Sequence, residues 1–152
     1  MQFNIYWIKT DAQLRHIKSP YWTQRKGVWY ELVFYNPNPA GKQVGDCPVR
    51  AIAKATGQSR DETYTGLCVQ GLAMGDMPSA NSVWGAYLCQ HGFIRNVIPN
   101  TCPDCYTVAE FAKGHPQSVY VLPLSDPVVC QLNGDYYDTW DSGNEILFFY
   151  WK

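Results

Sequence analysis

Charged side chains are scarce in this sequence, and neither sign is in clear excess. Asp, Glu, Lys and Arg make up 16% of the 152 residues, and the net charge is -1. Nucleic acids and anionic membranes attract proteins that carry a clear excess of Lys and Arg. The composition gives neither partner electrostatic support, so we expect no nucleic-acid and no membrane partner.

Long hydrophobic runs are also missing. No apolar stretch approaches the roughly 20 residues that a membrane-spanning helix needs. The first ten residues mix polar and aromatic side chains, whereas a signal peptide has an unbroken apolar segment. Because both features are missing, we expect a cytoplasmic protein whose six cysteines are reduced.

Aromatic residues are abundant, at 15% of the sequence. A chain of this length can bury the core of one domain. Residues 36–41 (Asn-Pro-Asn-Pro-Ala-Gly) disfavour both helix and strand, so we place there the boundary between an N-terminal strand arm (1–35) and a core domain (36–152). Two aromatic strands, Gln2–Lys9 and Gly27–Tyr35, are expected to pair within the arm.

Helix start and stop signals dominate the first part of the core domain. Pro48 suits the first turn of a helix, and Gly57 suits its left-handed end. Two Ser/Thr-x-x-Glu capping boxes and one apolar face that ends at Gly92 predict three more helices. The four helices are expected to begin near Cys47, Ser59, Ser79 and Thr107, and the second is expected to end at about Gly71.

Beyond residue 118 the pattern changes to that of strands. Short runs of β-branched and aromatic residues alternate with turn signals, and Asn133-Gly134 is a strong signal for a two-residue hairpin turn. Helices followed by an antiparallel sheet predict an α+β fold. The expected strands are Val119–Leu122, Val128–Leu132, Asp135–Trp140 and Ile146–Trp151.

Cys47 is the first candidate for chemistry. At a helix N-terminus, unpaired N–H groups and the positive end of the helix dipole favour a thiolate over a thiol. Cysteine hydrolases present their nucleophile in this way. The alternative from the residues alone is a small buried cysteine that begins a core helix.

The core domain also contains four segments that point to a family: GDCPVRAIAKATGQ, QGLAMGDMPSANSVWGAYL, IPNTCPDCYTVAEF and NGDYYDTWDSGNEI. Together they resemble small phage and prophage proteins described as papain-like cysteine peptidases. The resemblance covers roughly residues 36–152 and leaves the arm outside. It implies a papain-like fold, in which N-terminal helices pack on a C-terminal antiparallel sheet.

The resemblance also implies roles for individual residues. Cys47 matches the nucleophile of the family, and Gln43 lies near the position of a glutamine that helps to form the oxyanion hole. The carboxylate that orients the catalytic imidazole matches Asp141 best, with Asp138 as the nearby competitor. Such enzymes need all of these groups around one thiolate and one imidazole.

The imidazole itself is missing from its expected position. In the family pattern a histidine stands directly before a Val-Val pair, and here Val128-Val129 follows Pro127. Proline has no side-chain group that can exchange a proton with a thiol. The remaining histidines, any of which would have to replace it, are His16, His91 and His115.

The other cysteines have separate explanations. Cys102-Pro103-Asp104-Cys105 can be a redox pair, half of a zinc site or a plain turn. No second Cys or His pair stands at a matching spacing, so we expect no metal and no cofactor. Cys68, Cys89 and Cys130 fall on apolar faces and are expected in the core.

Two functions follow from these observations. The first is a papain-like pseudoenzyme that binds a host protein or a small-molecule immune signal, in a counter-defence role that the resemblance to phage proteins implies. The second is an active cysteine peptidase or amidase that uses Cys47 with a displaced base. A third hypothesis is that interleaved basic and aromatic residues of the arm form a binding surface. Such residues can stack on the bases of a nucleic acid and neutralise its phosphates. These residues are Tyr21, Trp22, Arg25 and Lys26.

Overall fold

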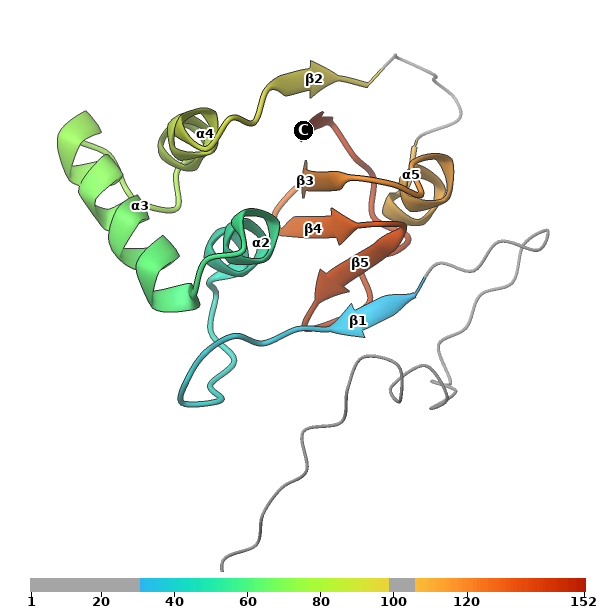
Figure 1. Cartoon of the computed structure of the whole chain (residues 1–152), viewed down its shortest axis with the longest axis horizontal. Coiled ribbons are helices and arrows are strands. Elements are labelled where there is room, and N and C mark those ends of the chain that lie inside the picture. Colours follow the sequence, from blue (N-terminus) through green and yellow to red (C-terminus); the bar gives the residue numbers. More distant parts are fainter. Residues whose placement is uncertain (1–30, 99–105) are drawn as a thin grey trace, which may run out of the picture.

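The computed structural model describes residues 31–98 and 106–152 (Figure 1). The described helices are α2 (Cys47–Thr56), α3 (Arg60–Met74), α4 (Asn81–Gln90) and α5 (Val108–Gly114). The described strands are β1 (Leu32–Phe34), β2 (Arg95–Val97), β3 (Val119–Pro123), β4 (Val128–Leu132), β5 (Asp135–Asp138) and β6 (Phe149–Trp151). The predicted α+β class is confirmed.

The strands form one open sheet in the order β1-β5-β4-β3-β6-β2. All described pairings are antiparallel except that of β1 with β5. Asn133 and Gly134 join β4 to β5 with φ values of 52° and 93°. These positive φ values are those of the predicted two-residue turn, which matches the twist of the two strands.

The described end of the N-terminal arm belongs to this sheet. β1 lies within the expected strand 27–35, and its Leu32 and Phe34 stand opposite Tyr136 and Asp138 of β5. The expected partner strand, Gln2–Lys9, lies outside the described residues. β1 therefore forms an edge of the core sheet, next to the hairpin that the sequence predicts.

The helix termini follow the predicted signals. Ser59 Oγ accepts a hydrogen bond from the Glu62 N–H, and the Glu62 carboxylate accepts one from the Ser59 N–H in return. Thr107 and Glu110 form the same reciprocal box at the start of α5. Such boxes satisfy N–H groups that have no partner within the helix.

Two helix boundaries differ from the prediction. α3 continues past Gly71 and ends at Gly75, whose φ is 66°. Gly71 is a close-packing position, because a Cβ there would lie 2.7 Å from the Asp76 carbonyl oxygen. α4 begins at Asn81, two residues later than expected.

β2 was not predicted, because it is short and lacks a run of β-branched residues.

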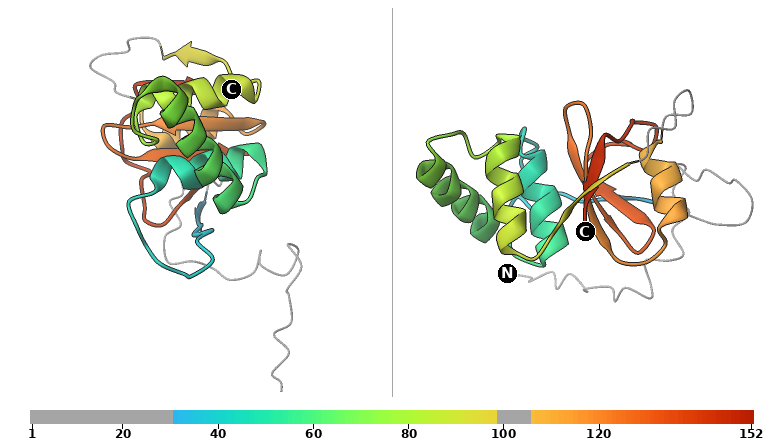
Figure 2. Two further views of the ribbon diagram at one scale, coloured as in Figure 1. Left: turned by 90° about the vertical axis from the view of Figure 1, so that its left-hand side faces the viewer. Right: turned by 90° about the horizontal axis from the view of Figure 1, so that it is seen from above.

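Side chains on the two faces of the sheet enter two separate clusters, since successive residues of a strand point to opposite faces. On one face Val121, Val128 and Cys130 pack with residues of α2, α3 and α4. On the other face Tyr120, Leu122 and Val129 pack with α5. Figure 2 shows the resulting layers, with α5 alone on its side of the sheet and α3 as the outermost element on the other side.

The helices within residues 31–98 and 106–152 are too short or too polar to cross a membrane.

Candidate functional site

Cys47 is the first residue of α2, preceded by Asp46 as the N-cap residue and followed by Pro48. Its side chain is partly exposed. The backbone N–H of Val128, the first residue of β4, points to the Cys47 sulfur and lowers the pKa of the thiol. The structure therefore places Cys47 at a helix N-terminus, as the sequence predicts, and sets it beside the start of β4.

The pKa of the Cys47 thiol is nevertheless raised above its ordinary value. Burial is the largest cause, since it penalises the charged thiolate, and the nearby Asp138 carboxylate adds to it. The N–H groups of Val128 and Cys47 and the Arg50 guanidinium act in the opposite direction without outweighing burial. The thiol, and not the expected thiolate, is therefore the favoured form at neutral pH, because desolvation outweighs the effect of the helix N-terminus here.

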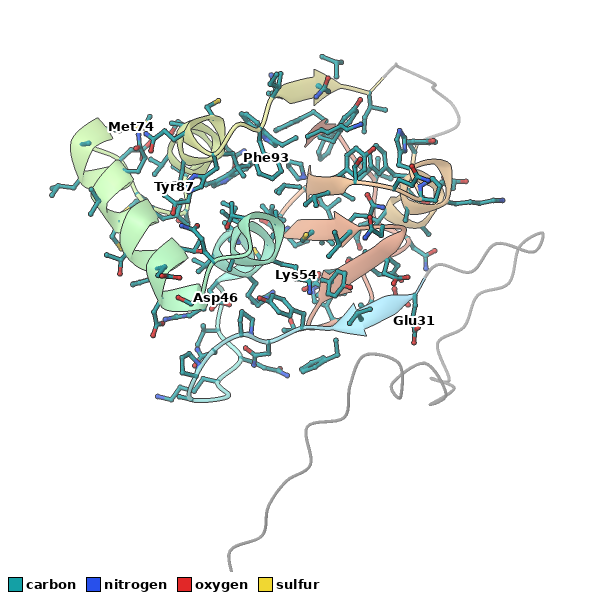
Figure 3. All side chains as sticks on the ribbon, viewed as in Figure 1. Glu31, Asp46, Lys54, Met74, Tyr87 and Phe93 are labelled. Atoms are coloured by element: carbon teal, nitrogen blue, oxygen red, sulfur yellow. The ribbon has the colours of Figure 1, made fainter. Side chains whose placement is uncertain are left out.

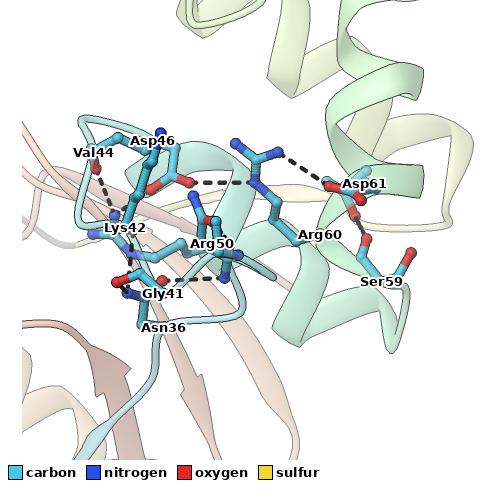
Figure 4. Close-up of polar contacts among 12 residues, drawn as sticks. Asn36, Gly41, Lys42, Val44, Asp46, Arg50, Ser59, Arg60 and Asp61 are labelled. Carbon is cyan, nitrogen blue, oxygen red and sulfur yellow. Dashed lines mark hydrogen bonds and ion pairs between the residues drawn. The ribbon is translucent and has the colours of Figure 1, made fainter.

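Arg50 and Asp138, which act on the pKa of Cys47, belong to a buried network of charges. Figure 4 shows the part of this network around Asp46 and Arg50. Arg50, one turn into α2, forms an ion pair with Asp46 on its own helix. Its second guanidinium nitrogen, Nη2, lies 3.2 Å from Asp138 Oδ1 at the end of β5. Arg50 Nη1 also donates to the Val44 carbonyl at 3.2 Å. Through these ion pairs and this hydrogen bond, Arg50 links the start of α2 to the end of β5.

The structure brings Asp138, rather than Asp141, to the candidate site. Asp138 is 2% exposed, and its Oδ1 accepts hydrogen bonds from Arg50 and from the Thr139 N–H. Its other oxygen, Oδ2, is buried and has no hydrogen-bond partner among the described residues. Asp141 lies in the turn after β5, where it accepts from the Tyr136 hydroxyl at 2.7 Å and from the Gly143 N–H at 3.0 Å.

The two described histidines are held away from Cys47. His115 ends α5, on the opposite face of the sheet, and its ring stacks on Phe111 at 4.0 Å between ring centroids. His91 follows α4 and packs on Tyr87, whose hydroxyl reaches Gln58 beyond the far end of α2. Figure 3 marks Tyr87 between α3 and α4. His16 lies outside the described residues.

Pro127 stands where the missing imidazole is expected in the sequence. It closes the turn between β3 and β4, in which its carbonyl accepts a hydrogen bond from the Leu124 N–H at 2.9 Å. The next residue is Val128, whose N–H points to the Cys47 sulfur. The backbone of position 127 therefore lies close to Cys47.

The other predicted site residues are placed as follows. Gln43 is exposed in the loop before α2. Cys130 is buried, which raises the pKa of its thiol to about 12, while Cys68 is half-buried. Cys89 is exposed, so its assignment to the core was wrong, because it lies on the outward side of α4. The residues outside the described part are Tyr21, Trp22, Arg25, Lys26, Cys102 and Cys105.

Groups of three or more Cys, His, Asp or Glu that could hold a metal ion do not occur among residues 31–98 and 106–152. Cys102 and Cys105, for which the sequence leaves a redox pair, half of a zinc site or a plain turn open, lie outside the described residues.

Asp46 and Arg50 are the site residues that sequence reasoning missed. Their i, i+4 spacing on a helix is a readable signal for an ion pair. The contact from Arg50 to Asp138 spans 88 positions in the sequence. It depends on how α2 packs against the sheet, so no local pattern reveals it.

Comparisons of this chain with protein-family models, with curated proteins and with solved structures find no match.

Proposed function

We propose that this chain is a papain-like protein that has lost hydrolytic turnover and acts by binding. Its partner in this proposal is a host protein or a small-molecule immune signal, in line with the resemblance of its sequence to small phage proteins. The papain-like assignment rests on a cysteine at the N-terminus of a helix that packs against the first residue of an antiparallel strand.

The observation that carries the proposal is the pairing of Asp138. In a complete Cys–His–carboxylate site the carboxylate accepts a hydrogen bond from the imidazole and holds it toward the thiol. Here Asp138 Oδ1 accepts from Arg50 and the Thr139 N–H, and no described imidazole donates to its other oxygen, Oδ2. A guanidinium stays protonated at physiological pH, so Arg50 cannot take the proton of a thiol as a histidine does.

The state of the thiol supports the same conclusion. A cysteine nucleophile acts as a thiolate, and the enzyme needs a general acid to protonate the leaving group. Burial raises the pKa of Cys47, and the residue before Val128 is a proline. Cys47 therefore has neither a lowered pKa nor a proton carrier among the described residues.

Replacing Cys47 by alanine separates binding from chemistry. We expect Cys47→Ala to retain the biological effect of the wild type, because binding does not require the thiol. The measurement is the plaque count of a phage on bacteria that carry an antiphage defence and express either form. The same experiment with Arg50→Leu serves as a control that perturbs the fold of the site.

Loss of the effect in Cys47→Ala, with unchanged circular dichroism and expression, would contradict the proposal. The protein would then be an active cysteine hydrolase whose base lies outside the described residues, with His16 as the first residue to test.

A further inference from the structure

Half of the Asp138 carboxylate has no partner among the described residues. Oδ1 accepts from Arg50 and from the Thr139 N–H, whereas Oδ2 is buried and accepts no hydrogen bond. A buried polar atom without a hydrogen bond costs free energy, and the cost is greatest for a charged group. In native proteins such an atom usually indicates a bound water, ion or ligand.

Asp138 Oδ2 differs from the other buried atoms that lack a hydrogen bond in the described part of the chain. Asp46 Oδ2 and Arg60 Nε belong to this group, but they face each other at 3.6 Å and neutralise each other. The remaining atoms are uncharged: Gln131 Oε1, Ser142 Oγ and Trp151 Nε1. Within residues 31–98 and 106–152, Asp138 Oδ2 is thus a buried charged oxygen that neither a hydrogen bond nor an ion pair of its own satisfies.

This oxygen belongs to the site at Cys47. Arg50, which holds the other oxygen of Asp138, stands one turn after Cys47 on α2. The Asp138 carboxylate lies near enough to the Cys47 sulfur to raise the pKa of the thiol. Cys47 is partly exposed, so a molecule from the solvent can contact it. A ligand that binds at Cys47 therefore comes close to an acceptor that lacks a donor.

The acceptor restricts the chemistry of that ligand. An ionised carboxylate only accepts hydrogen bonds, so an N–H or O–H donor satisfies Oδ2 and a second acceptor does not. Two buried carboxylates, Asp46 and Asp138, share the single guanidinium of Arg50. A ligand carboxylate or phosphate would meet Oδ2 with like charge. An ammonium group instead gives a charge-assisted hydrogen bond, which is the stronger kind.

We propose that the ligand of the Cys47 site carries an ammonium group that donates a hydrogen bond to Asp138 Oδ2. The inference rests on the proposed binding function and names the chemical class of the ligand. A small-molecule amine and the lysine side chain of a protein partner both present this group.

The test compares the alkylation of Cys47 by reagents of opposite charge. Bromoethylamine and iodoacetate attach an ammonium and a carboxylate at the same number of bonds from the sulfur. The exposed Cys89 of the same molecule is the reference, and peptide mass spectrometry gives the ratio of the two rates. We expect the Cys47-to-Cys89 ratio to be at least tenfold higher for bromoethylamine than for iodoacetate.

Asp138→Asn reverses the hydrogen bonding at the position of Oδ2. Asparagine has the same size, and its oxygen can still accept from Arg50 and from the Thr139 N–H. Its NH₂ group then replaces Oδ2 and donates, so we expect iodoacetate to become the preferred reagent at Cys47. Because Arg50 also acts on the Cys47 thiol, this comparison isolates the contribution of Oδ2.

Asp141→Asn is the matched control. It removes the same charge from the turn after β5, where Asp141 accepts from the Tyr136 hydroxyl and the Gly143 N–H. We expect this variant to keep the wild-type preference for bromoethylamine. Circular dichroism checks that both variants are folded.

Protection of Cys47 from iodoacetamide separates the two sources of the amine. Ethylammonium represents a small molecule, and Nα-acetyl-lysine amide carries the ammonium on the stem that it has in a protein. Stronger protection by the first indicates a small-molecule amine, and stronger protection by the second indicates a lysine side chain. Tetramethylammonium, which has the charge but no N–H donor, should not protect.

A Cys47-to-Cys89 ratio that does not depend on the charge of the reagent would overturn the proposal, because water or another group would then satisfy Oδ2. So would a preference that a folded Asp138→Asn leaves unchanged, or a lack of protection by both amines. The wild-type ratio and the protection decide the question if Asp138→Asn does not fold. None of these results bears on the proposed loss of turnover, which the biological effect of Cys47→Ala tests separately.

Discussion

Replacing Arg50 by leucine is expected to lower the free energy of unfolding by about 3–5 kcal/mol. The side chain of Arg50 is 9% exposed and lies between the carboxylates of Asp46 and Asp138. Removing the guanidinium leaves two buried carboxylates without their shared counter-charge and the Val44 carbonyl without its donor. Urea denaturation of the wild type and of Arg50→Leu measures the difference.

Arg60→Leu is the control for this prediction. Arg60 contacts the same Asp46, but at 3.6 Å and with 19% of its side chain exposed. Ion pairs that reach the solvent contribute only about 0–1 kcal/mol, so we expect a much smaller loss. If Arg50→Leu changed stability no more than a surface substitution does, within about 0.5 kcal/mol, the network would not hold α2 to β5.

The second large effect concerns turnover. We expect the wild type to hydrolyse peptide and amide substrates no faster than Cys47→Ala. General acid–base catalysis by a positioned side chain contributes about 10²–10⁴-fold, and the position before Val128 holds a proline. Release of a fluorescent amine from a panel of short peptide substrates measures the rate.

Hydrolysis by the wild type that disappears in Cys47→Ala would contradict this expectation. Pro127→His tests the position itself, because its backbone lies close to Cys47 through the neighbouring Val128. A gain of hydrolysis that depends on Cys47 in this variant would support the papain-like assignment. The control is Asp126→His, at the exposed residue that precedes Pro127.

Local signals in the sequence predicted most of the helices and strands, but they did not predict the charge network at the site. Pro48, Gly57 and the two capping boxes act within one helical turn, and the Asn133-Gly134 turn acts between adjacent strands, so the sequence reveals them directly. The parallel pairing of β1 with β5 joins segments about a hundred residues apart. No periodicity within either segment specifies that partner.

Cys47 also shows the difference between properties set by neighbouring residues and properties set by the packing of distant segments. Its place at a helix N-terminus follows from the neighbouring proline, but its pKa depends on how deeply the sheet and α2 bury the sulfur. Likewise, the family resemblance favoured Asp141, with Asp138 as the nearby competitor. Asp138 lies beside Arg50 because α2 packs on the sheet there. Asp141 instead accepts hydrogen bonds within the turn that follows β5.

The proposed function requires that no imidazole of the chain acts on Cys47. The most direct measurement is the rate of Cys47 alkylation by iodoacetamide as a function of pH, followed by mass spectrometry in the wild type and in His16→Ala. Burial raises the pKa of this thiol above the 9.0 that is usual for cysteine, so the rate should be low at neutral pH and rise only as the pH passes that value. The two proteins should give the same single transition. A plateau of fast alkylation at neutral pH that His16→Ala removes would contradict the claim, because it would reveal a thiolate paired with an imidazolium.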